Sequence, residues 1–175
     1  MSRSVLLLRA VNVGGRGKVP MAELRALLAP ELGEVSTYIA SGNIICEHPV
    51  DAEATRARVR ELIATAFSVD TTVILRTHAE LVQAAQEPPF ADASDKMLHA
   101  VFLEGHAAPG AVEALRERLV AGERIALVGD DLWIDYGEGG VQNTKLTKAV
   151  LDRALGVAGT ARNLRTVRAL AELTE

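Results

Sequence analysis

Two segments of the chain, residues 5–11 (VLLLRAV) and 97–103 (MLHAVFL), are apolar at nearly every position. Such a run is typical of a strand that is buried on both faces of its sheet. After each segment the same order of elements is expected: helix, strand, strand, helix, strand and one further helix. The βαββαβ order is that of the ferredoxin-like fold, in which two helices cover one face of an antiparallel sheet. The sequence therefore predicts an α+β protein with two ferredoxin-like halves, each followed by an extra helix.

Hydrophobic periodicity sets the expected elements. In the first half, strands are expected at residues 5–11, 35–40, 44–47 and 71–76, with helices from Pro20, after Asp51 and from Thr77. In the second half, strands are expected at residues 97–103, 124–128, 132–136 and 157–161, with helices from Pro109, at about 144–155 and after Asn163. Asp51, the Thr77–Glu80 pair and Asn163 have the residue types that cap helix starts.

Residues 86–96 (QEPPFADASDK) form the expected linker, because they contain two prolines and small polar residues without a hydrophobic period. The first half then covers residues 1–88 and the second covers residues 94–175. Each half alone buries little surface. Since helices cover only one face of a ferredoxin-like sheet, we expect the extra helices or the opposing half to cover the other face. The halves should therefore pack as one compact body, with the basic loops opening onto a shared cleft.

Composition limits the class of protein. The 175 residues are 49% hydrophobic and 24% charged, with a net charge of −4, which is typical of a soluble globular chain. Cys46 is the only cysteine, which excludes an internal disulfide and a multi-cysteine zinc site. The sequence holds no apolar run of the length of a membrane span or signal-peptide core. We expect a cytoplasmic protein with no membrane contact, metal or cofactor, and the sequence leaves its oligomeric state open.

The segment of residues 12–20 (NVGGRGKVP) is the strongest local indication of a binding site. Its glycines permit positive φ angles and close approach of the backbone, while Arg16 and Lys18 supply positive charge. Val19 stands where a capping side chain is expected, so the first amides of the next helix lack an obvious partner. Glycines, cations and an uncapped helix start together favour an anion site. The alternative is a surface loop that needs glycine only to turn.

Two further helix starts are basic. Gly137, Gly139 and Gly140 precede the helix expected at residues 144–155, which would carry Lys145 and Lys148 on one face. Arg162 and Arg165 flank the helix start at Asn163. Cations at a helix start oppose the helix dipole, which suggests a shared purpose for the three sites. The residues thus favour a ligand held by Arg9, Lys18 and the amides of Gly14 and Gly15, with Lys145 and Arg162 closing the site from the second half.

Four stretches of the chain resemble the domain-of-unknown-function 1697 family of bacterial proteins: VLLLRAVNVGGRGKVPMAELRALL, TYIASGNII, TKLTKAVLDRALGV and TARNLRTVRALAEL. The matching positions are Arg9, Asn12, Val13, Gly14, Gly15, Lys18 and Pro20, then Ser41, Gly42 and Asn43, then Lys145, Leu146 and Thr147, and finally Arg162, Asn163 and Thr166. Asn143 and Thr144 stand where the family often has a serine-rich stretch. The resemblance implies a two-part α+β fold and adds Asn12, Ser41, Asn43 and Asn163 to the expected ligand-binding residues. It implies no activity, because the family has no established one.

Familiar catalytic patterns are absent from the sequence. It contains no HExxH, no GxSxG and no paired-cysteine metal motif, and its histidines are scattered. Cys46 shares a strand face with Ile44, which indicates a buried thiol. Asp130 and Asp131 fall in a predicted hairpin turn, where aspartate is favoured for local hydrogen bonding. The sequence therefore leaves open whether the protein is an enzyme.

The leading hypothesis is a small protein that binds a phosphate- or carboxylate-bearing ligand through its glycine-rich basic loops. The first alternative is a nucleic-acid-associated module. It is disfavoured because most of the chain is acidic and because the expected strands of the first half carry no aromatic platform for bases. Phe102, Trp133 and Tyr136 in the second half are expected in the core. The second alternative is an interaction module without a ligand.

Overall fold

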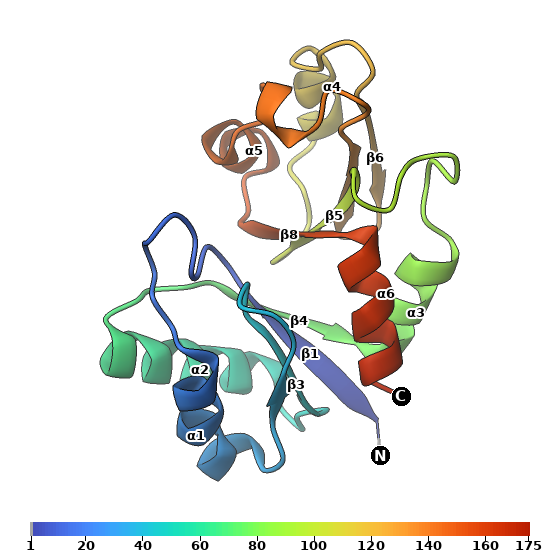
Figure 1. The fold of residues 1–175 in the computed structure, drawn as a ribbon. Helices are drawn as coiled ribbons and strands as arrows, with labels where there is room; N and C mark the ends of the chain where they lie inside the picture. The colour runs from blue at the N-terminus through green and yellow to red at the C-terminus, as the bar shows by residue number, and fades with distance from the viewer. Residues whose placement is uncertain (1) are drawn as a thin grey trace. The chain divides into compact units, whose positions relative to one another are not determined.

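The computed structural model describes residues 2–175. The chain is a mixture of helices and strands (Figure 1), and its strands form two four-stranded sheets. The strands are β1 (Arg3–Leu8), β2 (Ser36–Thr37), β3 (Asn43–Glu47), β4 (Val73–Thr77), β5 (Leu98–Leu103), β6 (Arg124–Val128), β7 (Asp131–Asp135) and β8 (Gly159–Asn163). The helices are α1 (Met21–Leu32), α2 (Ala52–Phe67), α3 (His78–Gln86), α4 (Ala111–Arg116), α5 (Lys148–Leu155) and α6 (Leu164–Leu173), with a 3-10 turn, η1, at Val141–Asn143. None of the helices in residues 2–175 has the length and apolar character needed to cross a membrane.

The first compact unit comprises Met1–Val82 and Ala169–Glu175. Its sheet has the order β2-β3-β1-β4, and every neighbouring pair is antiparallel. Leu6 in the central strand β1 lies opposite Ile44 on one side and Leu75 on the other. One face of the sheet packs against α1 and α2, as Figure 1 shows, through the fully buried side chains of Leu6, Leu8, Leu24, Leu28, Ile44, Val59 and Ile63.

The second compact unit comprises Gln83–Arg168. Its sheet has the order β6-β7-β5-β8 and is also antiparallel throughout. Val101 in the central strand β5 lies opposite Leu132 and Ala161. The helices α4 and α5 pack against this sheet through an aliphatic cluster that includes Val101, Leu103, Leu115, Leu132, Ile134 and Leu155. The structure therefore confirms the predicted α+β class, with the same strand order in both sheets.

Three predicted helix caps are confirmed. The Asp51 carboxylate accepts a hydrogen bond from the Ala54 amide at 2.9 Å. Thr77 and Glu80 form the expected capping box, in which the Thr77 amide donates to Glu80 Oε2 at 2.8 Å and the Glu80 amide donates to Thr77 Oγ1 at 3.2 Å. The Asn163 side chain accepts from the Thr166 amide at 3.0 Å. These starts are predictable because each cap is satisfied by groups within four residues.

Several element boundaries differ from the expected ones: β2 ends at Thr37 rather than at Ala40, and two further differences affect the candidate site. The first strand ends at Leu8 rather than Val11, because the chain turns at Ala10, which has a φ angle of +54°. The fifth helix begins at Lys148 rather than near residue 144, because Thr147 caps it by accepting a hydrogen bond from the Val150 amide at 3.3 Å. Lys145 and Lys148 consequently do not share a helix face, and Lys145 lies in the loop before α5.

The division into compact units differs from the expected halves at two places. The second unit begins at Gln83, inside α3, and the last seven residues belong to the first unit. Within that unit Thr174 is buried and its hydroxyl lies 3.0 Å from His78 Nδ1, which ties the end of the chain to the start of α3. The proposed linker at residues 86–96 contains no strand, and only its first residue is helical. Separate folding of residues 1–88 and 94–175 stays a prediction.

The buried thiol of Cys46 leads to a prediction about stability and pH. Burial, with a smaller contribution from the charge of Glu47, raises the pKa of Cys46 to about 11 from the 9.0 of an exposed cysteine. Between these values the thiol ionises in the unfolded chain but stays neutral in the folded one, so rising pH favours unfolding. The free energy of unfolding of the wild type should fall by about 2 kcal/mol relative to Cys46→Ala between pH 9 and 11.

Urea denaturation of both proteins across that pH range measures the difference. Comparison with Cys46→Ala removes the effect of other groups that titrate there, such as Tyr136, because both proteins share them. The difference between the two proteins should stay constant from pH 6 to pH 8, where the thiol is neutral in both states. A constant difference up to pH 11 would contradict a buried Cys46.

Candidate functional site

The glycine-rich segment forms a short hairpin between β1 and α1. Val13 and Arg16 exchange two backbone hydrogen bonds, of 3.2 and 2.9 Å, across the two-residue turn Gly14–Gly15. Gly14 and Gly15 have φ angles of +57° and +76°, which is the conformation of a type I′ turn. Next to this pair, at the base of the hairpin, the backbone amide of Asn12 donates to the Gly17 carbonyl at 2.8 Å. The segment is therefore an ordered hairpin with an exposed tip, and its glycines have a defined structural use.

The Asn12 side chain fastens this hairpin to two other segments. Its Oδ1 accepts from the Val19 amide at 2.8 Å, and its Nδ2 donates to the Val19 carbonyl at 2.9 Å. Nδ2 also donates to the Ala40 carbonyl, in the loop between β2 and β3, at 2.8 Å. One side-chain amide thus connects the base of the hairpin, Val19 just before the cap residue of α1, and the neighbouring loop. Because its groups are used in this way, Asn12 is a positioning residue.

The loop between β2 and β3, residues 38–42, packs against the same base. The Gly42 carbonyl accepts from the Leu8 amide at 2.8 Å, and a Cβ atom on Gly42 would lie 2.8 Å from side-chain atoms of Leu8 and Val11. Asn43 is fully buried, and its Nδ2 donates to the Tyr38 carbonyl at 2.8 Å and to Ser41 Oγ at 3.2 Å. The structure thus brings the Ser41–Asn43 block next to the glycine hairpin. The side chain of Asn43 closes its own loop, and that use competes with direct ligand contact.

Arg9 lies at the junction of β1 with the hairpin. Its amide donates to Thr71 Oγ1 at 2.9 Å and to the Thr72 carbonyl at 3.2 Å, while the Thr71 hydroxyl donates to the Arg9 carbonyl at 2.8 Å. Thr71 is buried, so this clamp holds the point where the chain leaves the sheet. Sequence reasoning missed Thr71, because its partner is 62 residues away and nothing local marks it.

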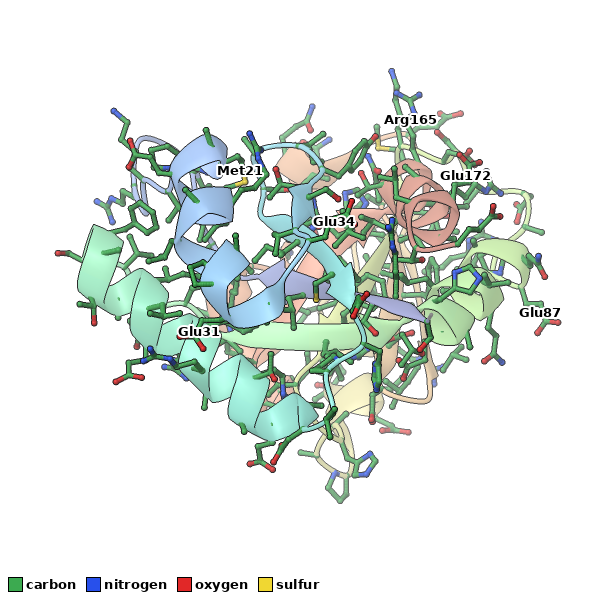
Figure 2. The ribbon with its side chains drawn as sticks, turned by 90° about the horizontal axis from the view of Figure 1, so that it is seen from below. Met21, Glu31, Glu34, Glu87, Arg165 and Glu172 are labelled. Atoms are coloured by element: carbon green, nitrogen blue, oxygen red, sulfur yellow. The ribbon has the colours of Figure 1, made fainter. Side chains whose placement is uncertain are left out.

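The cations of the hairpin face solvent. Arg16 and Lys18 are exposed, and within residues 2–175 neither side chain makes a hydrogen bond or an ion pair. Pro20, rather than Val19 as predicted, is the cap residue of α1, and it provides no side-chain cap, so the prediction of an uncapped helix start is confirmed. Figure 2 shows Met21 at this end of α1 and Glu31 toward the other end, where Glu31 pairs with Arg58 of α2 at 2.9 Å. The start of α1 and the two cations contribute positive charge at this end of the first unit, while Glu23 in the first turn of α1 contributes a negative one.

The expected residues of the second half lie in the second unit and have other local roles. Lys145 is exposed in the loop before α5, and Asn163 caps α6. Arg162 is buried, and its Nη1 donates to Thr160 Oγ1 at 2.8 Å and to the Ala161 carbonyl at 2.9 Å. Burial lowers the pKa of the Arg162 guanidinium to about 10. Loss of a positive charge there would require a pH far above neutrality, so Arg162 is a cation under ordinary conditions.

The other side chains of reactive types, among them Ser4, His48 and His99, have structural surroundings in residues 2–175. Ser4 Oγ lies 2.7 Å from His48 Nδ1, but Ser4 is fully buried and so is closed to a substrate. Burial lowers the pKa of His99, whose ring packs edge-on against Tyr136 at 5.0 Å. Across residues 2–175 no three histidine, cysteine or acidic side chains are grouped to hold a metal ion. Phe102, Trp133 and Tyr136 are buried, which confirms that they belong to the core.

Comparison with known proteins gives the family. Residues 1–133 match the family described as Protein of unknown function (DUF1697), and the chain belongs to that family. The matched residues include the glycine hairpin and the Ser41–Asn43 block, whereas Lys145 and Arg162 lie beyond them. No curated protein matches the chain.

A solved structure supports the fold. The chain is similar to a conserved bacterial protein, SP0830, from Streptococcus pneumoniae, with 23% sequence identity, a TM-score of 0.75 and 99% of each chain covered. At this identity the likeness concerns the fold alone.

The packing of Gly42 predicts that two glycines of the site differ in their tolerance of alanine. Gly42→Ala should lower the free energy of unfolding by about 2–4 kcal/mol, because the new Cβ meets Leu8 and Val11 and the φ angle of +87° disfavours a side chain. Gly14→Ala should cost only about 1 kcal/mol, because no atom lies within 4 Å of its Cβ position. Urea denaturation of the two variants measures both values. Equal losses would show that Gly42 does not pack against β1 as described.

Proposed function

We propose that the first unit binds a small phosphate- or carboxylate-bearing molecule at the glycine hairpin and the start of α1. The observation that carries the proposal is the pair of exposed, unpartnered cations, Arg16 and Lys18, on a hairpin with a fixed backbone. A charge-assisted hydrogen bond from each cation contributes about 1.5–3 kcal/mol. Because the backbone is already ordered by Asn12, little conformational entropy is lost on binding.

The backbone amides of Gly14 and Gly15 complete the proposed anion site. In the type I′ turn, the Val13 and Arg16 amides are used within the hairpin, while the amides at the two central positions have no hydrogen-bond partner among residues 2–175. Donors that point into solvent beside two cations are suited to the oxygens of a phosphate or carboxylate group. Arg9, Asn12, Ser41 and Asn43 belong to this proposal as residues that shape the loops. Roles for Lys145, Arg162 and Asn163 stay predictions of the sequence.

A small anion fits the charge distribution better than a polyanion. Glu23 is exposed in the first turn of α1, and Glu34 is exposed just beyond its end. The chain as a whole has a net charge of −4. Glu23 at the hairpin end of α1 and the net negative charge of the chain repel an extended phosphate backbone more than a single anionic group, whereas Glu34 lies beyond the far end of the helix. We also propose a cytoplasmic location, because a chain with a single cysteine does not depend on an internal disulfide.

We further infer that the two units are ferredoxin-like and related by duplication. The shared strand order of the two sheets supports this inference. A second support is a pair of buried arginines, Arg76 in the edge strand β4 and Arg162 in the edge strand β8. Each arginine directly precedes the last residue of its strand, which is a helix cap. Each donates from Nη1 to the carbonyl of the preceding residue, at 3.0 Å in Arg76 and 2.9 Å in Arg162. The residues Thr77 and Asn163 that follow them both cap helices. This local correspondence escaped the periodicity analysis, because it involves side-chain roles rather than hydrophobic pattern.

Titration calorimetry with inorganic phosphate, nucleoside monophosphates and dicarboxylates tests the anion site. The wild type should bind at least one of these classes, and the double variant Arg16→Ala/Lys18→Ala should weaken that binding at least tenfold. Neither side chain has a partner in residues 2–175, so the double variant should keep the wild-type melting temperature.

A matched control removes the same charge elsewhere. Arg116 and Arg118 are exposed at the end of α4 in the second unit, and Arg116→Ala/Arg118→Ala should leave anion binding unchanged. No binding by the wild type, or equal loss in both double variants, would refute the site. Binding of a single-stranded RNA with a steep salt dependence, in place of the small anions, would favour the nucleic-acid alternative.

A further inference from the structure

Two apolar side chains are exposed beside the proposed anion site. Val13, in the hairpin, is 61% exposed and Ile39, in the loop between β2 and β3, is 49% exposed. Val13 follows Asn12 and Ile39 precedes Ala40. Because the Asn12 side chain donates a hydrogen bond to the Ala40 carbonyl, the loops that carry Val13 and Ile39 are joined. The cations Arg16 and Lys18 belong to the same hairpin as Val13. The two joined loops therefore carry exposed apolar groups, Val13 and Ile39, together with exposed basic groups, Arg16 and Lys18.

Ile39 is in an unfavourable conformation for its type. Its φ angle is +50°, in the left-handed region that glycine and asparagine tolerate and that branched side chains avoid. A buried isoleucine can offset such strain through core packing, but the side chain of Ile39 contributes little to the core because half of it is exposed. The fold alone therefore gives no reason for a large apolar side chain at this position, whereas an apolar ligand would.

We propose that the ligand of the anion site is amphiphilic: a small acidic group, phosphate or carboxylate, that is carried on an apolar alkyl or acyl body. This inference rests on the proposed function. Arg16, Lys18 and the Gly14 and Gly15 amides hold the acidic group, and Val13 and Ile39 contact the apolar body. Exposed cations without a partner among residues 2–175, and exposed apolar side chains on loops joined by a hydrogen bond, are complementary to such a molecule, because its acidic group and its apolar body each gain a suitable partner.

Calorimetry with hexyl phosphate and inorganic phosphate tests the inference on the full chain. The wild type should bind hexyl phosphate about tenfold more tightly, because the alkyl chain and the two side chains bury apolar surface together. In Val13→Ser and in Ile39→Asn, the affinity for hexyl phosphate should fall toward the affinity for inorganic phosphate. The affinity for inorganic phosphate itself should stay unchanged. Ile39→Asn suits the left-handed backbone, so this variant should fold with an undiminished melting temperature.

Val50→Ser provides the matched control, because Val50 is a fully exposed valine that precedes α2 and should not affect either ligand. If the wild type binds both phosphates equally, or if Val13→Ser and Ile39→Asn keep the tenfold preference, the amphiphilic ligand is refuted and the anion site stands. If neither phosphate binds, the proposed function itself fails. Binding to dioleoylphosphatidylglycerol vesicles without binding to free hexyl phosphate would also refute the inference, since it would identify a membrane surface as the partner.

Discussion

The arrangement of the candidate site depends on the side-chain amide of Asn12. Its hydrogen bonds, of 2.8–2.9 Å, hold the base of the glycine hairpin to the Val19 backbone and to Ala40 in the next loop. Val19, which this amide holds, is fully buried two residues before the start of α1. Without the Asn12 side chain, the amide and the carbonyl of Val19 would lose a partner in a partly buried setting, at a cost of about 1–3 kcal/mol each, and the exposed Ala40 carbonyl would lose one as well. The exposed cations and the turn glycines keep their positions because this amide fixes the segment that carries them.

Packing of the neighbouring loop adds a second constraint. Gly42 touches Leu8 and Val11 so closely that no side chain fits there, and the buried Asn43 closes the same loop. The Thr71 hydroxyl meanwhile holds both backbone groups of Arg9. Three segments far apart in the sequence thereby fix the end of β1. The positive φ angles of Ala10, Asn12 and Ile39 are gathered in this region, which is where strain is expected if the loops serve binding.

Local rules account for the parts of the fold that the sequence predicted. The caps at Asp51, Thr77 and Asn163 depend on neighbours within one helical turn, and the apolar runs of β1 and β5 depend on burial alone. The end of β1 was predicted three residues too late, because the Thr71 clamp and the contact with Gly42 that stop the strand come from distant segments. The glycine hairpin was located correctly as a basic loop, but its ordered turn and the positioning role of Asn12 depend on Ala40, 28 residues away.

Asn12 orders the hairpin through its three hydrogen bonds, and in the proposed function it does so without touching the anion. Titration calorimetry with inorganic phosphate on the wild type and on Asn12→Ala tests it directly. Loss of the Asn12 hydrogen bonds should weaken phosphate binding about tenfold or more, with a more unfavourable binding entropy, because the hairpin must then become ordered as the anion binds. The Asn12→Ala variant should still unfold cooperatively in urea, which shows that the chain remains folded. Equal affinity and equal entropy in the two proteins would contradict the account.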